Sequence, residues 1–390
     1  NFIYNNIVIK DETIIEFSYL ENKWTPLRIR DDKTKTYENE KIKKQFKGPN
    51  NWYTAFTNWD IIQNPITSEM IKGKVLIPSK TKESYWVDKK ATDRLVASKY
   101  GRLIHYLCYK FITEKLKEVD FISLLELAGG QIGDIHNWIE NKIDHVSVVD
   151  IDKTALIEGE KRYKSLRKEK KSDLPHIDFY EFDLRNDLTK DLSKEFSKLK
   201  DKKFNIISSM LALHYFLRSE SSLDIIYKNI DHYLMDNGYV IFTFMDGKKV
   251  FDFLKTKKIK NDESYIWRSK KTGSKIYEIT RKYESSKFAT LGQKINVYVK
   301  SIGNTHEEYL VNYKNLKKYF KDKKYDVINS ETFDEHFKKW NDIGKKNEGQ
   351  KEKKKLGRFT PELMSEEEME FTGFYRYVIL QKKSKSKKKK

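Results

Sequence analysis

The stretch LLELAGGQIGD at 124–134 constrains the fold of this 390-residue chain more than any other. An apolar run of strand length ends at Gly129-Gly130, and a helical pattern follows through Trp138. A second apolar run, VSVVD, then ends at Asp150. A strand, a glycine turn, a helix and a second strand with a carboxylate at its tip are typical of α/β folds that bind a nucleoside cofactor. Because the full G-x-G-x-x-G spacing is missing, an ordinary βαβ turn is the alternative at this point.

The same rhythm continues to residue 255, where apolar strand candidates alternate with helical segments. The later strand candidates are 176–184, 204–215 and 239–246, and a helix is predicted across 221–234. Such alternation predicts a doubly wound, mostly parallel sheet. Ligands bind outside the carboxyl ends of the strands in such sheets. We therefore expect one site to gather the polar residues near those ends, which are Asp134, Asp150, Asp183, His214 and Tyr215.

The N-terminal part of the chain has a different composition. Residues 1–66 read as short strands and turns, with alternation in IIEFSYL that suits a half-buried strand. Residues 67–95 are basic and polar, which predicts a linker. A helix is expected across 98–118, because Leu103, Leu107 and other apolar residues recur on one face.

The C-terminal part contains strand-like pieces after residue 260 and a helix predicted across 308–324. Residues 338–357 are highly charged and nearly free of apolar side chains, which predicts a disordered loop. A last strand is expected within 373–383. The lysine tail at 384–390 is expected not to fold.

The chain is basic, with a formal net charge of +20, although seven of its lysines lie in the last ten residues. A basic surface favours a polyanion such as nucleic acid, and a solvated lysine-rich face is the plain alternative. Cys108 is the only cysteine, which excludes internal disulfides and cysteine-based zinc sites. We expect a reducing, cytosol-like compartment, no membrane span and no metal. Because the sequence begins with Asn rather than Met, we expect a fragment of a longer protein.

The strand-end residues and their neighbours resemble the mRNA cap guanine-N7 methyltransferases over roughly 96–383. The motifs that carry the likeness are LLELAGGQIGDIHNW, FNII…HY at 204–215, MDG at 245–247 and HEEYLVNY at 306–313. The nearest likeness is to the C-terminal region of the multifunctional capping enzymes of large DNA viruses, of poxvirus, asfarvirus and mimivirus type. The resemblance implies a class I S-adenosylmethionine-dependent methyltransferase fold, a Rossmann-like doubly wound sheet.

A second resemblance concerns residues 1–66, which look like the end of the OB-fold of capping nucleotidyltransferases. Their last motif, Arg-x-Asp-Lys, is matched by Arg30, Asp32 and Lys33. The nucleotidyl-lysine motif Lys-x-Asp-Gly does not occur in the sequence. The implied architecture is a small OB-fold-like β segment before the methyltransferase domain, without formation of a lysyl-guanylate.

The resemblance also implies a set of cofactor contacts. Asp150 would accept from the ribose hydroxyls of S-adenosylmethionine, Asp183 would face the adenine amino group, and Asp134 would lie near the methionine amine. The lysine that holds the cofactor carboxylate aligns with Tyr109 by one count and with Lys110 by another; the cation is preferred chemically and the register stays open. The remaining cofactor positions are Ala128, Gly130, Met210 and Tyr215.

For the cap, the resemblance implies that Glu308 accepts hydrogen bonds from guanine N1–H and the 2-amino group. His214 and Tyr215 would lie between cofactor and base, Tyr375 would flank the guanine, and Tyr106 would lie near the cap. Guanine N7 carries a free lone pair, so no general base is required, and catalysis would come from positioning.

The sequence departs from the family at Gln131 and Ile132, where the family has Lys and Gly. A catalytically weakened subunit that binds RNA or a capping partner is therefore the competing hypothesis. A DNA amino-methyltransferase is disfavoured because its Asn/Asp-Pro-Pro-Tyr/Phe signature is missing from the sequence. The implied partners are capped RNA, the rest of a capping polypeptide and, in poxvirus-type relatives, a small stimulatory subunit. The implied location is the cytoplasm, a virus factory or the virion.

Overall fold

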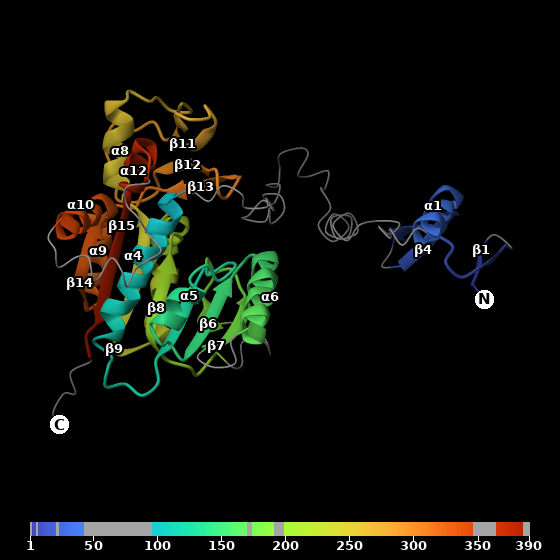
Figure 1. The fold of residues 1–390 in the computed structure, drawn as a ribbon, viewed down its shortest axis with the longest axis horizontal. Helices are drawn as coiled ribbons and strands as arrows, with labels where there is room; N and C mark the ends of the chain where they lie inside the picture. The colour runs from blue at the N-terminus through green and yellow to red at the C-terminus, as the bar shows by residue number, and fades with distance from the viewer. Residues whose placement is uncertain are drawn as a thin grey trace. The chain divides into compact units, whose positions relative to one another are not determined.

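The computed structural model describes residues 2–4, 7–20, 23–42, 96–169, 174–190, 199–345 and 364–384 (Figure 1). The chain divides into two compact units, residues 1–81 and 82–390. The expected linker at 67–95 and the expected tail at 385–390 lie outside the described residues.

The N-terminal unit contains two small antiparallel hairpins and one helix. Strands β1 (Phe2–Tyr4) and β2 (Ile7–Ile9) form the first hairpin, and β3 (Ile15–Leu20) and β4 (Lys23–Ile29) form the second. Helix α1 (Asp31–Ile42) follows directly. The guanidinium of Arg30 binds the Asp32 carboxylate through Nε at 2.9 Å and Nη2 at 2.8 Å. No barrel closes among the described residues of this unit, so the OB-fold assignment stays a prediction.

The larger unit is built on a seven-stranded sheet with the order β14-β15-β9-β8-β5-β6-β7. Five of its strands run parallel, as the alternating pattern predicts; β15 runs antiparallel to both of its neighbours. The strands are β5 (Ser123–Leu127), β6 (His145–Asp150), β7 (His176–Glu181), β8 (Phe204–Met210), β9 (Leu234–Met245), β14 (Tyr325–Thr332) and β15 (Tyr375–Lys382).

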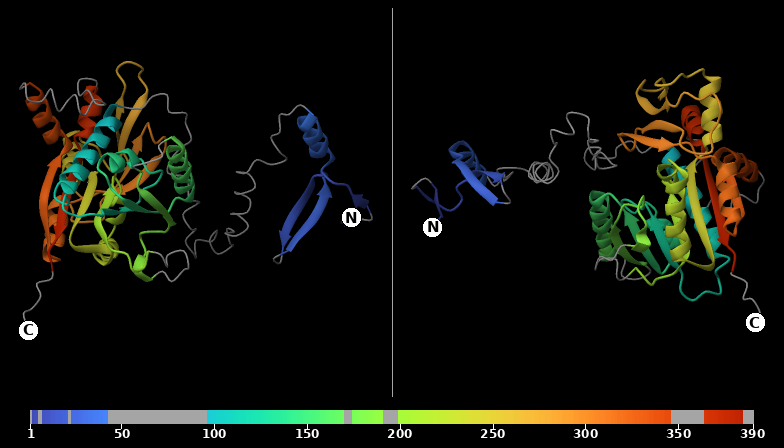
Figure 2. Two further views of the ribbon diagram at one scale, coloured as in Figure 1. Left: turned by 60° about the horizontal axis from the view of Figure 1, so that its bottom comes forward. Right: turned by 180° about the vertical axis from the view of Figure 1, so that it is seen from behind.

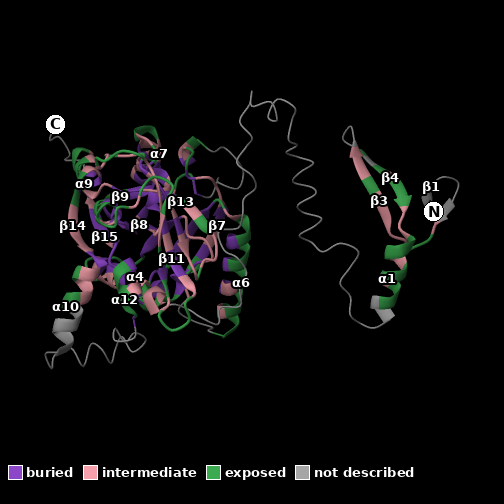
Figure 3. Ribbon diagram, turned by 90° about the horizontal axis from the view of Figure 1, so that it is seen from above, coloured by how far each residue is buried: buried purple, intermediate pink, exposed green. Residues whose placement is uncertain are grey.

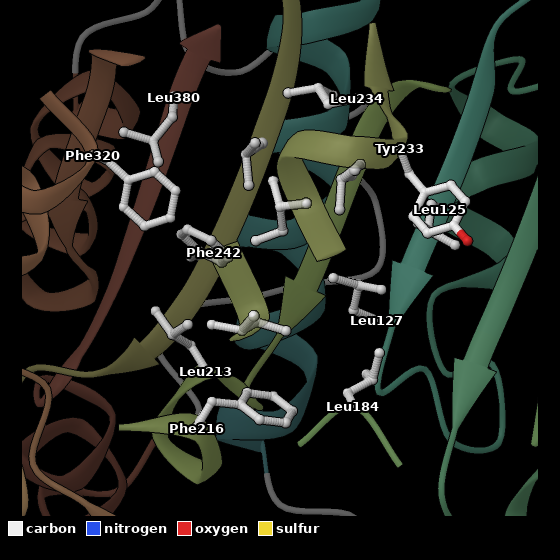
Figure 4. Packing of buried hydrophobic residues seen from close by; sticks show 14 of the residues in the cluster. Leu125, Leu127, Leu184, Leu213, Phe216, Tyr233, Leu234, Phe242, Phe320 and Leu380 are labelled. Carbon is white, nitrogen blue, oxygen red and sulfur yellow. The ribbon is translucent and has the colours of Figure 1, made fainter. Parts of the chain in front are cut away.

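Helices cover both faces of this sheet because alternate strand residues point to opposite sides (Figures 2 and 3). Leu124 packs on one side and Leu125 on the other. The first face is covered by α4 (Val96–Thr113), α5 (Ile135–Glu140), α6 (Lys153–Glu169) and the start of α10 (Phe333–Lys345). The second face is covered by α7 (Glu220–Tyr233) and α9 (Tyr313–Asp322), where Tyr233 and Phe320 pack against the strands (Figure 4).

A second, four-stranded antiparallel sheet is inserted between β9 and α9. Its strands are β10 (Ser264–Arg268), β11 (Lys275–Lys282), β12 (Lys294–Val299) and β13 (Thr305–Tyr309). Helices α8 (Gly247–Thr256) and α12 (Glu366–Thr372) pack against it through a separate apolar core. Backbone pairing of Asp246 with Val311 ties the insertion to the carboxyl end of β9.

Two sequence predictions are wrong in part. The helix predicted over 308–324 is shorter, because residues up to Tyr309 form β13 and the helix α9 begins at Tyr313. The loop predicted over 338–357 is contradicted for 338–345, which continue α10; Phe333 and Phe337 of this helix pack on the sheet core. A helix whose first turns pack on the core therefore continues into the charged segment.

No helix in the described part of the chain is both long and apolar enough to cross a membrane.

Candidate active site

The carboxyl edge of the parallel strands carries several strained backbone positions. Ala128, Ile132 and Leu211 have positive φ angles of 59°, 51° and 56°, and Gly130 has 50°. Each lies just after β5 or β8. A non-glycine residue in this region costs conformational energy, and such residues cluster at functional sites. The backbone therefore turns sharply where the sequence predicts a cofactor.

The glycine turn after β5 is tightly packed. A Cβ on Gly129 would lie 2.7 Å from Val148 Cγ1 and 2.8 Å from Glu126 Cγ. The amide of Ala128 donates to the Val149 carbonyl at 2.8 Å, which pins the turn to β6. Only glycine fits at position 129 without displacing its neighbours.

Asp150 ends β6 and holds the glycine turn in place. Its Oδ2 accepts from the Gly130 amide at 2.7 Å, and its Oδ1 accepts from the Asp152 amide at 2.7 Å. The side chain is buried, and this burial raises the pKa of the carboxyl. The carboxylate thus lies at the strand end that the sequence predicts, fixed by two backbone donors.

Asp134 immediately precedes α5 and is buried in a short row of hydrogen-bonded polar side chains. Its Oδ2 lies 2.8 Å from His105 Nδ1, and its Oδ1 accepts from Asn137 Nδ2 at 2.9 Å. The other ring nitrogen of His105 lies 3.3 Å from Thr243 Oγ1 on β9. These hydrogen-bonded side chains connect α4, α5 and β9 at the carboxyl edge of the sheet. Neither His105 nor Thr243 was predicted from the sequence as a site residue, although His105 precedes Tyr109 by one helical turn.

Tyr109 points into the core rather than toward solvent. Its hydroxyl oxygen lies 2.9 Å from Glu126 Oε2 and 3.1 Å from Ser208 Oγ, within hydrogen-bonding distance of both, and Ser208 donates to Glu126. Burial raises the pKa of Glu126 to about 8. The neighbouring Lys110 is half-exposed, with Nζ 3.8 Å from Glu114 Oε1. Tyr109 is engaged by the sheet core, so Lys110 is the residue of the two with a cation to offer.

Asp183 follows β7, and its carboxylate is engaged by Arg185. The Arg185 Nη2 donates to Oδ2 at 2.7 Å and Nε donates to Oδ1 at 2.9 Å. The preceding amide, of Phe182, donates to the Asp150 carbonyl at 2.9 Å. Asp183 therefore lies just after β7, at the predicted strand end, and the Phe182 contact places it beside the end of β6; its charge is partly compensated by a guanidinium.

His214 and Glu308 meet although 94 positions separate them in the sequence. His214 belongs to the turn η3 (Leu213–Phe216) after β8, and Glu308 belongs to β13 of the inserted sheet. The His214 Nε2 lies 3.5 Å from Glu308 Oε1, and both side chains are buried. Burial raises the pKa of Glu308 to about 8 and lowers that of His214 to about 3. Two predicted cap residues thus form a neutral, buried polar pair at pH 7.

The other predicted residues take more peripheral places. Tyr215 is half-buried, and its ring meets that of His214 edge-on with centroids 4.3 Å apart. The Sδ atom of Met210 lies 3.7 Å from Thr243 Oγ1. Tyr375 is half-buried at the start of β15 and packs on Phe371. Tyr106 is half-buried on α4 and packs against the apolar core on that face of the sheet.

The two departures from the family behave differently. Ile132 is fully buried in the apolar core while its φ is 51°, a costly conformation for a β-branched residue. Gln131 is partly exposed on the same turn. Burial of the Ile132 side chain compensates for the backbone strain that a glycine would avoid.

The doubly wound sheet and its carboxyl-edge site define a class I S-adenosylmethionine-dependent methyltransferase. Residues 89–383 match the family described as the mRNA (guanine-N(7))-methyltransferase domain. The chain belongs to this family.

Several curated proteins are similar to the chain. A probable mRNA-capping enzyme of Acanthamoeba polyphaga mimivirus is 27% identical, over 87% of this chain and 33% of its own length. An mRNA-capping enzyme of African swine fever virus is 24% identical, over 57% of this chain and 26% of its own length. An mRNA cap guanine-N(7) methyltransferase of Drosophila melanogaster is 22% identical, over 56% of this chain and 49% of its own length. The chain spans a third or less of the two viral relatives.

A solved S-adenosylmethionine-dependent methyltransferase from Clostridium acetobutylicum is 14% identical, with a TM-score of 0.43, over 86% of this chain and all of its own.

Proposed function

We propose that this chain transfers a methyl group from S-adenosylmethionine to N7 of the guanosine cap of viral mRNA. The observation that carries the proposal is the buried His214–Glu308 pair beside the carboxyl edge of the sheet. Membership of the cap methyltransferase family supports the choice of substrate.

The residues at the carboxyl edge fit a nucleoside cofactor. Asp150 offers a buried carboxylate to ribose hydroxyls, and the cradle at Gly129 leaves no room for a Cβ. Asp134 offers negative charge near the methionine amine, and Lys110 offers a cation for the carboxylate. When bound, S-adenosylmethionine supplies an electrophilic methyl group on a sulfonium. Asp183 would accept from the adenine amino group while Arg185 retains its contact.

Glu308 selects guanine in this proposal. Guanine presents N1–H and a 2-amino group side by side, and an ionised carboxylate accepts from both. Adenine presents an acceptor at N1, which would face the carboxylate unfavourably. A buried site built for two hydrogen bonds discriminates strongly against a base that lacks them. His214, Tyr215 and Tyr375 would position the base.

No side chain needs to remove a proton, because N7 carries a lone pair at neutral pH. The contribution of the protein is to hold N7 in line with the methyl group and to exclude water. Positioning of this kind supplies several kcal/mol in well-aligned cases, on the order of 7–11 kcal/mol at most. With guanine bound, the neutral imidazole of His214 and the ionised carboxylate of Glu308 provide a preorganised polar environment.

The competing function is a weakened methyltransferase fold that binds RNA or a capping partner. The observation that favours it is the turn at Gln131 and Ile132, which departs from the family. The proposed partners are capped RNA and the rest of a capping polypeptide, with a small stimulatory subunit as a further candidate. We place the activity in the cytoplasm of the infected cell, a virus factory or the virion.

The test is incubation of the chain with methyl-labelled S-adenosylmethionine and RNA capped with GpppG or GpppA. Label recovered in 7-methylguanosine after nuclease digestion is the expected result. RNA already methylated at N7 is the matched control and should take no label. Tight cofactor binding by calorimetry without any transfer would overturn the enzymatic proposal and favour the weakened-fold alternative.

A further inference from the structure

A cluster of polar residues lies at the amino ends of the parallel strands, opposite the carboxyl ends where the proposed cofactor site lies. His145 is the first residue of β6 and His176 the first of β7, and the two are register partners. Asp178 follows His176 by two positions and so points to the same side of the strand. Sheet pairing thus brings three potential metal ligands from two strands together.

The ligand atoms of the three side chains converge. Nε2 of His145 lies 2.9 Å from Asp178 Oδ2, and Nε2 of His176 lies 3.2 Å from Asp178 Oδ1. All three ligand atoms lie within 4.8 Å of one another. The two imidazole rings are stacked, with centroids 5.5 Å apart. Donor atoms around a zinc ion, each at about 2.0–2.2 Å from it, are separated by similar distances.

A lysine ammonium already lies among these donors. Nζ of Lys202 is 3.0 Å from Asp178 Oδ2 and 3.4 Å from His145 Nε2. The cluster therefore accommodates one positive charge in the present structure. Because the Lys202 side chain is about one-third exposed, at 35%, it can move into solvent.

The cluster lines a cavity of about 600 Å³. The other walls include Phe121, Ser123, Phe204 and Asn205. Three protein ligands and a cavity of this size leave room for water as a further ligand, which is the arrangement of open zinc sites. The cavity is an observation independent of the ligand distances.

We propose that His145, His176 and Asp178 bind a divalent transition-metal ion, best matched by zinc, in exchange for the Lys202 ammonium. Two imidazole nitrogens and one carboxylate oxygen form a ligand set of intermediate hardness, which suits zinc better than calcium or magnesium. The site does not depend on the methyltransferase chemistry, because it lies at the opposite edge of the sheet. Its metal cross-links β6 and β7 and stabilises the folded chain.

The test is titration of the full chain with zinc by calorimetry, together with cobalt(II) absorption spectra. We expect one bound zinc ion per chain, an intense cobalt spectrum of low coordination number and a raised melting temperature with zinc. His176→Ala removes an exposed ligand and should weaken binding at least tenfold. Lys202→Met removes the competing cation and should tighten it.

His136→Ala is the matched control, because His136 is an exposed histidine on α5 that does not line the cavity, and its loss should leave zinc binding unchanged. Zinc binding that His176→Ala leaves unaltered would overturn the proposal. So would a failure of both the wild-type chain and Lys202→Met to take up zinc. A melting temperature that rises with inorganic phosphate and not with zinc would assign the cavity to an anion and would equally overturn it.

Discussion

The imidazole of His214 lies 3.5 Å from the carboxyl group of Glu308, measured from Nε2 to Oε1. The two side chains are 3% and 7% exposed, and neither ring nitrogen of His214 has a hydrogen-bond partner within the described ranges. Buried polar atoms without partners are rare in folded proteins and often mark binding sites. The pair joins the turn after β8 to the inserted sheet, so a base bound there would contact both parts of the domain.

Replacement of Glu308 by Gln should strongly reduce cap methylation while cofactor binding persists. The amide keeps the size of the side chain but presents a donor to one of the two guanine N–H groups. Because a hydrogen bond to a charged group contributes about 1.5–3 kcal/mol, we expect kcat/KM to fall about 100-fold or more. The measurements are methyl transfer to GpppG-capped RNA and calorimetric titration with S-adenosylhomocysteine.

Glu307→Gln is the matched control, since Glu307 is the exposed neighbour that pairs with Lys294 at 3.0 Å. It should leave kcat/KM nearly unchanged. If Glu308→Gln lost cofactor affinity as well as activity, Glu308 would not be a dedicated cap residue.

Cap binding should strengthen as pH rises toward 8. Burial holds the pKa of Glu308 at about 8, so the free protein carries a protonated carboxyl at pH 7. Guanine binds the ionised carboxylate, so binding must release that proton. The free-energy cost of this release becomes smaller as the pH approaches the pKa of Glu308. The measurement is the affinity for GpppG, from about pH 6 to about pH 8.5. Glu308→Gln should show a flat profile; the same slope in both proteins would exclude Glu308 as its source.

Replacement of Asp150 by Asn should weaken the cofactor complex at least about tenfold. The carboxylate accepts from the amides of Gly130 and Asp152, and in the proposal also from ribose hydroxyls. Removing its charge weakens each of these hydrogen bonds. Calorimetry with S-adenosylhomocysteine measures the affinity, and a melting curve without ligand separates this loss from unfolding. Unchanged affinity in a folded variant would place the ribose elsewhere.

Gly129→Ala should destabilise the domain by about 1–3 kcal/mol, because the added methyl overlaps Val148 and Glu126 side-chain atoms. Gly133→Ala on the same turn meets nothing within 4 Å and should be neutral or stabilising by about 0.4–1 kcal/mol. Urea unfolding measures both. Equal effects of the two substitutions would contradict the close packing of Gly129 against Val148 and Glu126.

Glu126 should make the domain less stable as pH rises from about 4.5 to about 8. Its folded pKa of about 8 exceeds the ordinary value of 4.5, so the unfolded chain loses this proton first and the folded state is progressively disfavoured. The amide of Glu126→Gln resembles the protonated acid. This variant therefore lacks the pH dependence that Glu126 gives to the free energy of unfolding, which has a limiting slope of about 1.4 kcal/mol per pH unit. Urea unfolding at several pH values should therefore show a variant advantage that grows with pH. A constant difference would mean that Glu126 is ionised in the folded domain.

Much of the large domain could be predicted from local sequence patterns. Continuous apolar runs predicted strands that begin near residues 124, 146 and 204, because buried parallel strands need continuous apolar side chains. The strand predicted over 204–215 is shorter, because β8 ends at Met210 and the chain then enters the turn η3. Charge alone was misleading for α10, where residues 338–345 continue a helix whose first turns pack on the sheet core through Phe333 and Phe337. The strand at Glu308 was predicted as helix because β13 is short and runs directly into the start of α9.

The sequence by itself determined the alternation of strands and helices, the glycine turn and the strand-end carboxylate of Asp150, because these follow from local periodicity and backbone sterics. Only the tertiary structure decided that His214 meets Glu308, that His105 reaches Asp134, and that His145 and His176 share one register. Such contacts join segments far apart in the chain, so they depend on strand order and packing rather than on any local pattern.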